Sequence, residues 1–302
     1  MTTEFTGRTA VITGAASGFG LETARLAARL GMNVVMADVM AAPLAAARDE
    51  VATRGPGRVI AHTTDVRHAE AIEALAQVTQ ATFGAPHLVF NNAGVSSGGL
   101  IWEHSAREWD WVLGVNLMGV AHGVRVFTPM MLAAEKADPA YRGHIVNTAS
   151  MAGLMNMPNM GVYNVSKHAV VSLSETLYQD LALVSERVHA HVLCPFFVPT
   201  GIIRSDRARP EDARDDARQT ASQRVAQQFG EKAVSSGKVS AAQVAQNVFD
   251  AMAARRFYIY SHPQALAGVM TRAEDILRGD CPSDPYAAKP QLGEALRAAL
   301  AG

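Results

Sequence analysis

Residues 13–20 read Thr-Gly-Ala-Ala-Ser-Gly-Phe-Gly, and this glycine-rich stretch joins an apolar run at 8–13 to an amphipathic segment at 21–30. The apolar run predicts a buried strand, and the segment after it predicts a helix that ends at Gly31. Glycines in such a turn permit positive φ and let the backbone approach a pyrophosphate, which the first amides of the helix can hold. Glycine-rich turns are common in structural loops, but the strand-to-helix context favours a dinucleotide site. The candidate cofactor-binding residues in this turn are Gly14, Ser17, Gly18, Phe19 and Gly20.

The same alternation of apolar runs and helical patterns continues along the chain. Further strands are predicted at 33–37, 58–62, 87–90, 144–149, 188–193 and 257–260. Further helices are predicted at 41–54, 69–83, 109–134, 162–186 and 240–255. Strands separated by helices imply right-handed crossovers, and strands that are apolar throughout fit a parallel sheet covered on both faces. We therefore predict an α/β fold, a Rossmann-type doubly wound parallel sheet in a single domain with a C-terminal tail.

Two stretches depart from this alternation of strands and helices. Residues 200–238 are rich in charged side chains, which usually form a solvated helix face. Because they follow the carboxyl end of a strand, they are also a candidate substrate lid. Residues 261–302 form a C-terminal extension with a Pro-, Asp- and Ser-rich part and a short helical pattern at 291–300. We therefore predict one dinucleotide-binding and catalytic domain over residues 1–260, followed by this extension.

The composition excludes several classes of protein. The 302 residues are 49% apolar and 18% charged, with 27 Lys and Arg against 28 Asp and Glu, so a disordered chain or a nucleic-acid partner is not expected. The two cysteines lack a zinc or redox spacing, and His189 and His191 share a strand face without a recognisable third ligand, so no metal is predicted. No signal-peptide pattern and no run of about 18 uninterrupted apolar residues is present. We expect a cytoplasmic protein without a membrane partner.

Asp38 ends the second predicted strand, 18 residues after Gly20. A carboxylate at that position can accept hydrogen bonds from the adenosine ribose diol, and it repels a 2′-phosphate. Neither Ser17 nor Val39 supplies a cation for such a phosphate. The alternative is that Asp38 caps the turn that follows it. The pattern favours NAD over NADP as the cofactor.

A second polar group lies farther along the chain. Tyr163 and Lys167 are four residues apart, which places them on one face of a predicted helix. A free tyrosine titrates near pH ~10, and a neighbouring ammonium can lower that pKa by about 1–3 pH units. Tyr-x-x-x-Lys alone is often only a surface pair. Ser150, however, ends the fifth predicted strand, so all three are expected at the carboxyl edge of the sheet, where such folds bind ligands.

Taken together, these motifs resemble those of the short-chain dehydrogenase/reductase family. The glycine turn, the Asn-Asn-Ala-Gly of residues 91–94, Asn116, Ser150 and Tyr163-x-x-x-Lys167 occur in the family's order over roughly residues 5–260. The resemblance implies that Tyr163 is the general acid/base and that Ser150 hydrogen-bonds the substrate oxygen. It implies that Lys167 holds the nicotinamide ribose and lowers the tyrosine's pKa, and that Asn116 holds a water in the proton relay.

The resemblance also implies cofactor contacts outside the turn. Relatives typically have Pro-Gly and then Thr after the sixth strand, whereas residues 194–200 read Cys-Pro-Phe-Phe-Val-Pro-Thr. Phe196 therefore replaces the glycine, which puts the backbone path and the nearby pocket wall in question. The implied additional cofactor-binding residues are Asp65, Val66, Asn92, Ala93, Gly94, Tyr163, Lys167, Pro195, Val198 and Thr200.

The region between Ser150 and Tyr163 contains four methionines, at positions 151, 155, 157 and 160. Methionine suits an adaptable apolar wall, although core packing accounts equally well for any one of them. As a group between catalytic candidates, they favour a hydrophobic secondary alcohol or ketone as substrate. The candidate substrate-binding residues are Ser150, Met151, Met157 and Phe196.

The sequence therefore predicts an NAD(H)-dependent oxidoreductase that interconverts a hydrophobic secondary alcohol and its ketone. The alternative is a non-catalytic NAD(H)-binding sensor on the same fold, which would be expected to lack one of the Ser, Tyr or Lys residues. A nucleotide-sugar epimerase or dehydratase would normally have a different glycine spacing and a larger C-terminal domain. The resemblance also implies a homotetramer or homodimer that associates through the helices at 109–134 and 162–186.

Overall fold

A single parallel sheet organises the part of the chain that the computed structural model describes, residues 5–214 and 218–301. Its strand order is β3-β2-β1-β4-β5-β6-β7, and every neighbouring pair is parallel. The strands are β1 (Thr9–Thr13), β2 (Asn33–Asp38), β3 (Val59–Thr63), β4 (Leu88–Asn91), β5 (Gly143–Thr148), β6 (Val188–Cys194) and β7 (Tyr258–Tyr260). The order reverses between β1 and β4, so the predicted doubly wound Rossmann-type sheet is confirmed.

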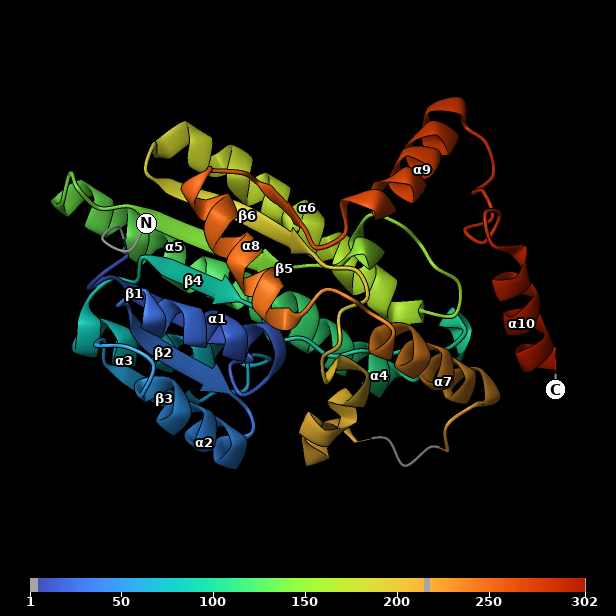
Figure 1. Ribbon diagram of the computed structural model, residues 1–302, viewed down its shortest axis with the longest axis horizontal. Helices are drawn as coiled ribbons and strands as arrows, with labels where there is room; N and C mark the ends of the chain where they lie inside the picture. Colours follow the sequence, from blue (N-terminus) through green and yellow to red (C-terminus); the bar gives the residue numbers. More distant parts are fainter. Residues whose placement is uncertain (1–4, 215–217, 302) are drawn as a thin grey trace.

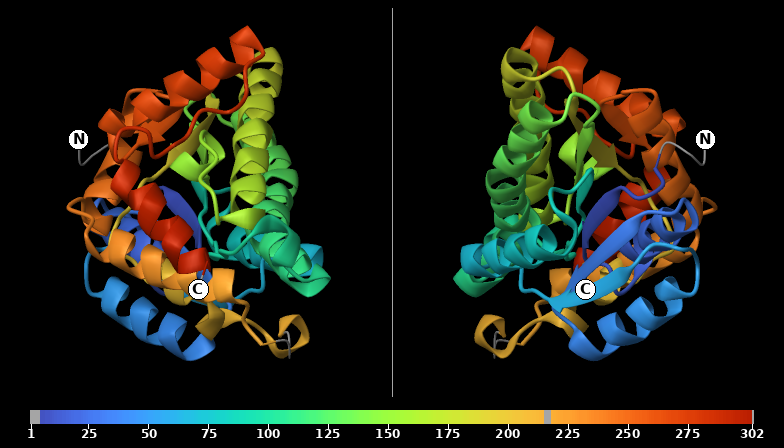
Figure 2. Two further views of the ribbon diagram at one scale, coloured as in Figure 1. Left: turned by 90° about the vertical axis from the view of Figure 1, so that its right-hand side faces the viewer. Right: turned by 90° about the vertical axis from the view of Figure 1, so that its left-hand side faces the viewer.

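Helices cover both faces of this sheet (Figure 1, Figure 2). One face carries α1 (Gly18–Arg29), α2 (Ala41–Ala52) and α8 (Ala241–Ala253). The other face carries α3 (Ala69–Phe83), α5 (Gly119–Ala137) and α6 (Gly161–Val184). The two faces explain why the strands are apolar throughout, because successive side chains point to opposite sides and both sides are buried.

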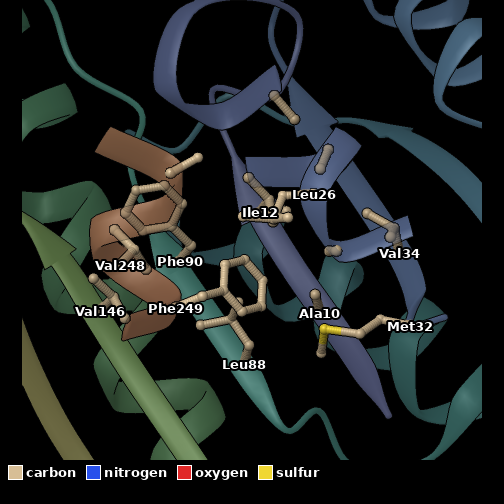
Figure 3. Packing of buried hydrophobic residues seen from close by; sticks show 14 of the residues in the cluster. Ala10, Ile12, Leu26, Met32, Val34, Leu88, Phe90, Val146, Val248 and Phe249 are labelled. Atoms are coloured by element: carbon tan, nitrogen blue, oxygen red, sulfur yellow. The ribbon is translucent and has the colours of Figure 1, made fainter. Parts of the chain in front are cut away.

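The two largest hydrophobic clusters of the core lie one on each face of the sheet. Figure 3 shows the cluster beneath α1 and α8, where Ile12 of β1 and Phe90 of β4 lie near Phe249 of α8. The neighbouring strand residues Val11 and Val89 belong to the cluster on the opposite face. Because these side chains fill both faces of the sheet, polar groups gather at the carboxyl ends of the strands instead.

The predicted helix at 109–134 is longer than expected and is not a regular α-helix. It consists of α4 (Ala106–Leu113), a π-helical turn η3 (Gly114–Met118) and α5.

Together α4, η3 and α5 form the helical run Ala106–Ala137, which is long and apolar enough to span a membrane. Its most apolar window of 18 residues has a mean hydropathy of 1.3, and 28% of that window is buried. The helical run contains no stretch of about 18 uninterrupted apolar residues, because Asn116, His122 and Arg125 interrupt the apolar residues. Length and composition are weak evidence for a span, because core helices also satisfy these criteria, and α5 packs on β4 and β5. The expected absence of a membrane partner stays a prediction.

The charged stretch after β6 forms two short 3₁₀ turns and one helix. These are η5 (Ile202–Ala208), η6 (Glu211–Ala213) and α7 (Ala221–Ser235), and residues 215–217 lie outside the described part of the chain. Three further 3₁₀ turns are η2 (Ile101–Glu103), η4 (Met151–Gly153) and η7 (Pro263–Ala265).

The C-terminal tail is helical and stands out from the body of the molecule (Figure 1). It contains α9 (Leu266–Arg278), which the sequence patterns did not predict, and α10 (Pro290–Ala301), which corresponds to the predicted short helix. The helix α10 packs on α7, so the tail lies against the segment that follows β6.

Candidate active site

A pocket opens at the carboxyl edge of the sheet, where the strand order reverses, and it brings together most of the candidate residues. Two candidates, Gly20 and Asn116, do not line it. The candidate residues that line the pocket are Gly14, Ser17, Gly18, Phe19, Asp38, Asp65, Val66, Asn92, Ala93, Gly94, Ser150, Met151, Met157, Tyr163, Lys167, Pro195, Phe196, Val198 and Thr200. The topology thus gathers residues from β1, β2, β4, β5 and β6 at one edge, as the sequence analysis expected.

The glycine turn has the backbone that close approach to a phosphate requires. Gly14 and Gly18 have φ values of +65° and +56°, which only glycine adopts without strain. Ser17 is the N-cap residue of α1, but its side chain makes no capping hydrogen bond to the helix. A Cβ on Gly20 would collide with the carbonyl oxygen of Gly14, so Gly20 allows the helix to pack on the turn. The turn therefore fits a dinucleotide, with Gly20 in a packing position.

Asp38 is buried and its carboxylate is held by two backbone amides. Its Oδ2 accepts a 3.1 Å hydrogen bond from the Ala16 amide, and its Oδ1 accepts a 3.0 Å bond from the Met40 amide. The capping alternative is thus present in the structure. Each carboxylate oxygen has further acceptor capacity, so the same group remains able to accept from a ribose hydroxyl.

Thr13 and Asn92 join the glycine turn to the loop after β4. The Thr13 hydroxyl oxygen accepts from the amides of Asn92 and Ala93, at 2.9 and 3.1 Å, and the Asn92 side-chain amide donates to the Thr13 carbonyl at 2.9 Å. Farther along this loop, a Cβ on Gly94 would lie 3.5 Å from Lys167 Nζ. These contacts explain why polar and small residues follow β4.

Tyr163 and Lys167 lie on the same face of α6, with Lys167 Nζ 5.7 Å from the centroid of the tyrosine ring. Burial lowers the pKa of the Lys167 ammonium to about 8. Burial also raises the pKa of the Tyr163 phenol, and a hydrogen bond with the Ser150 side chain acts in the opposite direction. Desolvation of the phenol is the largest effect on its pKa, so the expected lowering by Lys167 stays a prediction.

Asn116 is fully buried in the π-helical turn. Its Oδ1 accepts from the Val95 amide at 2.8 Å, and its Nδ2 donates to the Val95 carbonyl and to Ser166 Oγ, each at 3.0 Å. The side-chain amide is thus used to hold the loop after β4 against α6. Any part that Asn116 takes in a proton relay must involve its backbone, and π-helical turns often occur at functional sites.

Ser150 lies two residues beyond the end of β5 rather than in the strand. It is the N-cap residue of η4, and its hydroxyl oxygen accepts from the Ala152 amide at 3.1 Å. The methionine-rich segment follows directly, and Met151, Met155, Met157 and Met160 all line the pocket. Phe196 also lines it, with its backbone amide donating to Ser261 Oγ at 2.9 Å. The residue that replaces the family's glycine is therefore held by the start of the C-terminal extension.

Several pocket residues in the segment after β6 have no sequence pattern that predicts their place. That segment was identified as a candidate lid from its charge, but no local pattern distinguishes the residues that face the pocket. These residues are Gly201, Ile202, Ile203, Ser205, Arg207, Ala208 and Pro210. Arg67 and Trp111 also line the pocket and have no recognisable sequence signal.

His144 of β5 and His191 of β6 form a buried pair. His144 Nδ1 lies 3.0 Å from His191 Nε2, and His191 Nδ1 lies 2.7 Å from the Arg256 carbonyl oxygen. In residues 5–214 and 218–301, no group of three or more His, Cys, Asp or Glu side chains is arranged to hold a metal ion. The expectation that the protein needs no metal stays a prediction.

Comparison with known proteins identifies the class to which this fold and site belong. The family model described as short chain dehydrogenase matches residues 8–211, so the chain belongs to the short-chain dehydrogenase/reductase family of oxidoreductases. It is 31% identical to the CLA biosynthesis dehydrogenase/reductase of Lactiplantibacillus plantarum, over 92% of this chain and 96% of that protein. It is 34% identical to the cyclohexanol dehydrogenase of an Acinetobacter species, over 67% of this chain and 78% of that protein.

Solved structures extend the comparison to the cofactor. A short-chain dehydrogenase/reductase from Burkholderia phymatum, in complex with NAD, is 52% identical with a TM-score of 0.90, covering 93% of this chain and 98% of that one. A metagenomic short-chain oxidoreductase in complex with NADP is 32% identical with a TM-score of 0.58, covering 63% of this chain and 83% of that one. Similar structures thus bind both nicotinamide cofactors.

Proposed function

We propose that this short-chain dehydrogenase/reductase is an NAD(H)-dependent enzyme that interconverts a hydrophobic secondary alcohol and its ketone. The observation that carries the proposal is the convergence of Ser150, Tyr163 and Lys167 between the glycine turn and the methionine-rich wall of one pocket. A sensor that only binds NAD(H) would not need a tyrosine and a lysine buried together at that position.

The pocket fits a dinucleotide on three grounds. The turn has glycines where positive φ and close backbone approach are needed, the Ser17 hydroxyl does not cap α1, and Asp38 holds a fixed carboxylate at the end of β2. NAD, when bound, accepts or returns the hydride at its nicotinamide ring. The amides at the start of α1 are suited to its phosphates.

The proton chemistry belongs to the chain's own side chains. In alcohol oxidation, the Tyr163 phenolate takes the hydroxyl proton while Ser150 holds the substrate oxygen. In ketone reduction, the Tyr163 phenol returns that proton. Lys167 Nζ, which donates a 2.9 Å hydrogen bond to the Thr148 carbonyl, is held beside the tyrosine, where it would also bind the nicotinamide ribose. The backbone carbonyl of Asn116 would hold the water that connects Lys167 with solvent.

The preference for NAD over NADP rests on Asp38. A carboxylate fixed by two backbone amides cannot turn away from a 2′-phosphate, and like charges at that distance repel. The NAD complex of the relative that is 52% identical supports this preference, because the NADP-bound structure is less similar to this chain.

The substrate class rests on the wall beside Ser150. Four methionines and Phe196 present flexible and aromatic surface to the pocket, which suits an apolar substrate body. The similarity to a cyclohexanol dehydrogenase supports an alicyclic alcohol as the first candidate. Absorbance at 340 nm with NAD and a panel of alicyclic, aromatic and polyhydroxylated alcohols tests the proposal. Turnover of polyols alone would overturn the substrate class, and NADH binding without any turnover would favour the sensor.

We also propose that the protein is a homodimer or homotetramer that associates through α5 and α6. Exposed apolar side chains on α6 support this, since Val165, Tyr178, Leu183 and Val184 are 41%, 44%, 83% and 67% exposed. Burial of such surface between two copies stabilises association.

A further inference from the structure

The segment 201–213 crosses the rim of the pocket, and one end of it is anchored on α4. The Arg209 guanidinium lies 3.6 Å from the centroid of the Trp111 ring, and it forms a 2.8 Å ion pair with Glu108. A second carboxylate, Asp206, lies 2.8 Å from the same guanidinium. Arg209 is therefore stacked and neutralised, which fixes the segment against α4.

A second anchor joins the segment to the loop before α3. Asp212 forms a 3.1 Å ion pair with Arg67, which also pairs with Asp65 at 2.7 Å. Arg67 and Asp65 precede α3, and Asp65 is one of the implied cofactor-binding residues. The segment thus extends from α4 to the loop before α3, and both of its anchoring arginines have carboxylate partners.

Arg207 precedes both anchoring contacts in the segment and differs from the two anchoring arginines. Its Nη2 donates a 3.3 Å hydrogen bond to Ser17 Oγ, and the side chain lines the pocket together with Gly14 and Gly18. Within the described ranges 5–214 and 218–301, no carboxylate forms an ion pair with Arg207. A Cβ on Gly201 would lie 2.6 Å from Nη2, so this glycine makes room for the guanidinium.

We infer that Arg207 binds the pyrophosphate of the dinucleotide and so couples cofactor binding to the position of segment 201–213. The inference rests on the proposed function, because it assumes that the pocket takes NAD(H). The glycine turn itself contains no cation, and the amides of α1 supply only the partial charge of a helix N-terminus. A planar guanidinium that no carboxylate of residues 5–214 and 218–301 neutralises, next to the helix N-cap residue, is suited to two phosphate oxygens.

Direct binding measurements test the inference without relying on turnover. NADH fluorescence titrations would compare the wild type with Arg207→Gln and with Arg204→Gln, an exposed arginine of the same segment that does not line the pocket. We expect a Kd about 10-fold higher for Arg207→Gln and an unchanged Kd for Arg204→Gln. Arg207→Lys should recover part of the affinity, because a point charge replaces the planar fork.

Binding of ADP-ribose and adenosine, measured at several salt concentrations, shows whether Arg207 acts on the pyrophosphate or on the pocket as a whole. Arg207→Gln should weaken ADP-ribose but leave adenosine binding unchanged, because adenosine has no pyrophosphate. The difference between wild type and variant should shrink at high ionic strength. Equal Kd values of the wild type and Arg207→Gln for NADH and ADP-ribose would overturn this inference alone. A wild type that binds neither NADH nor ADP-ribose would instead overturn the proposed function.

Discussion

Lys167 Nζ donates a 2.9 Å hydrogen bond to the carbonyl oxygen of Thr148, and this bond ties α6 to the end of β5. Ser150 lies two residues after Thr148, and Tyr163 lies one helical turn before Lys167. The bond therefore fixes the distance between the two elements that carry the candidate catalytic side chains. Loss of it would disturb the site even if Tyr163 and Ser150 were unchanged.

The first prediction concerns the acid/base. Tyr163→Phe should lower kcat by at least about 100-fold, because it removes the group that transfers the proton while keeping the ring. The Kd for NADH should change little, since the pyrophosphate and adenosine contacts lie elsewhere in the pocket. Steady-state kinetics and NADH titration check the two parts, and a variant that retains most of its activity would remove Tyr163 from the mechanism.

The second prediction concerns cofactor preference. Asp38→Asn keeps an acceptor for the amides of Ala16 or Met40 but removes the negative charge. The ratio of kcat/KM for NAD to that for NADP should fall by about 10-fold, since repulsion of the 2′-phosphate is relieved. An unchanged ratio would show that Asp38 serves only as a cap. Asp49, an exposed carboxylate on α2, offers a matched control as Asp49→Asn.

The third prediction concerns stability in acid. Burial lowers the pKa of His191 to about 4, well below its ordinary value of 6.5. The unfolded chain therefore binds a proton near pH 6.5 that the folded protein rejects until about pH 4, so the free energy of unfolding falls as pH drops through that range. The loss from this residue is about 3 kcal/mol.

Urea denaturation at several pH values between 7 and 4 measures this loss. His191→Gln should flatten the dependence of the free energy of unfolding on pH, although it also removes the hydrogen bond to the Arg256 carbonyl. A slope in His191→Gln equal to that of the wild type would contradict the assignment.

The fourth prediction concerns assembly. The wild type should sediment as a dimer or tetramer at micromolar concentration, and Leu183→Asp should shift it toward smaller species because a carboxylate would be buried in the interface. Leu277→Asp on α9 is a control of similar exposure, since Leu183 and Leu277 are 83% and 86% exposed. A monomeric wild type would refute the proposed association through α6.

Local pattern determined the fold class and the glycine turn, and the resemblance to a family supplied most of the other pocket residues. Periodic and short-range features can be recognised without the structure. In this chain they are the strands that are apolar on both faces, the helices with one apolar side and the glycine turn at 13–20. The order of the motifs then predicted that Asp38, Ser150, Tyr163 and Lys167 would meet at one edge of the sheet, and they line one pocket.

Tertiary structure decided what depends on distant contacts and on burial. Arg207 meets Ser17, and Asp212 meets Arg67, across separations of 190 and 145 residues that no local pattern relates. The side-chain amide of Asn116 is used by Val95, which the motif alone does not reveal. The direction of the Tyr163 pKa shift is likewise a property of the whole fold, because desolvation depends on every element that covers the phenol.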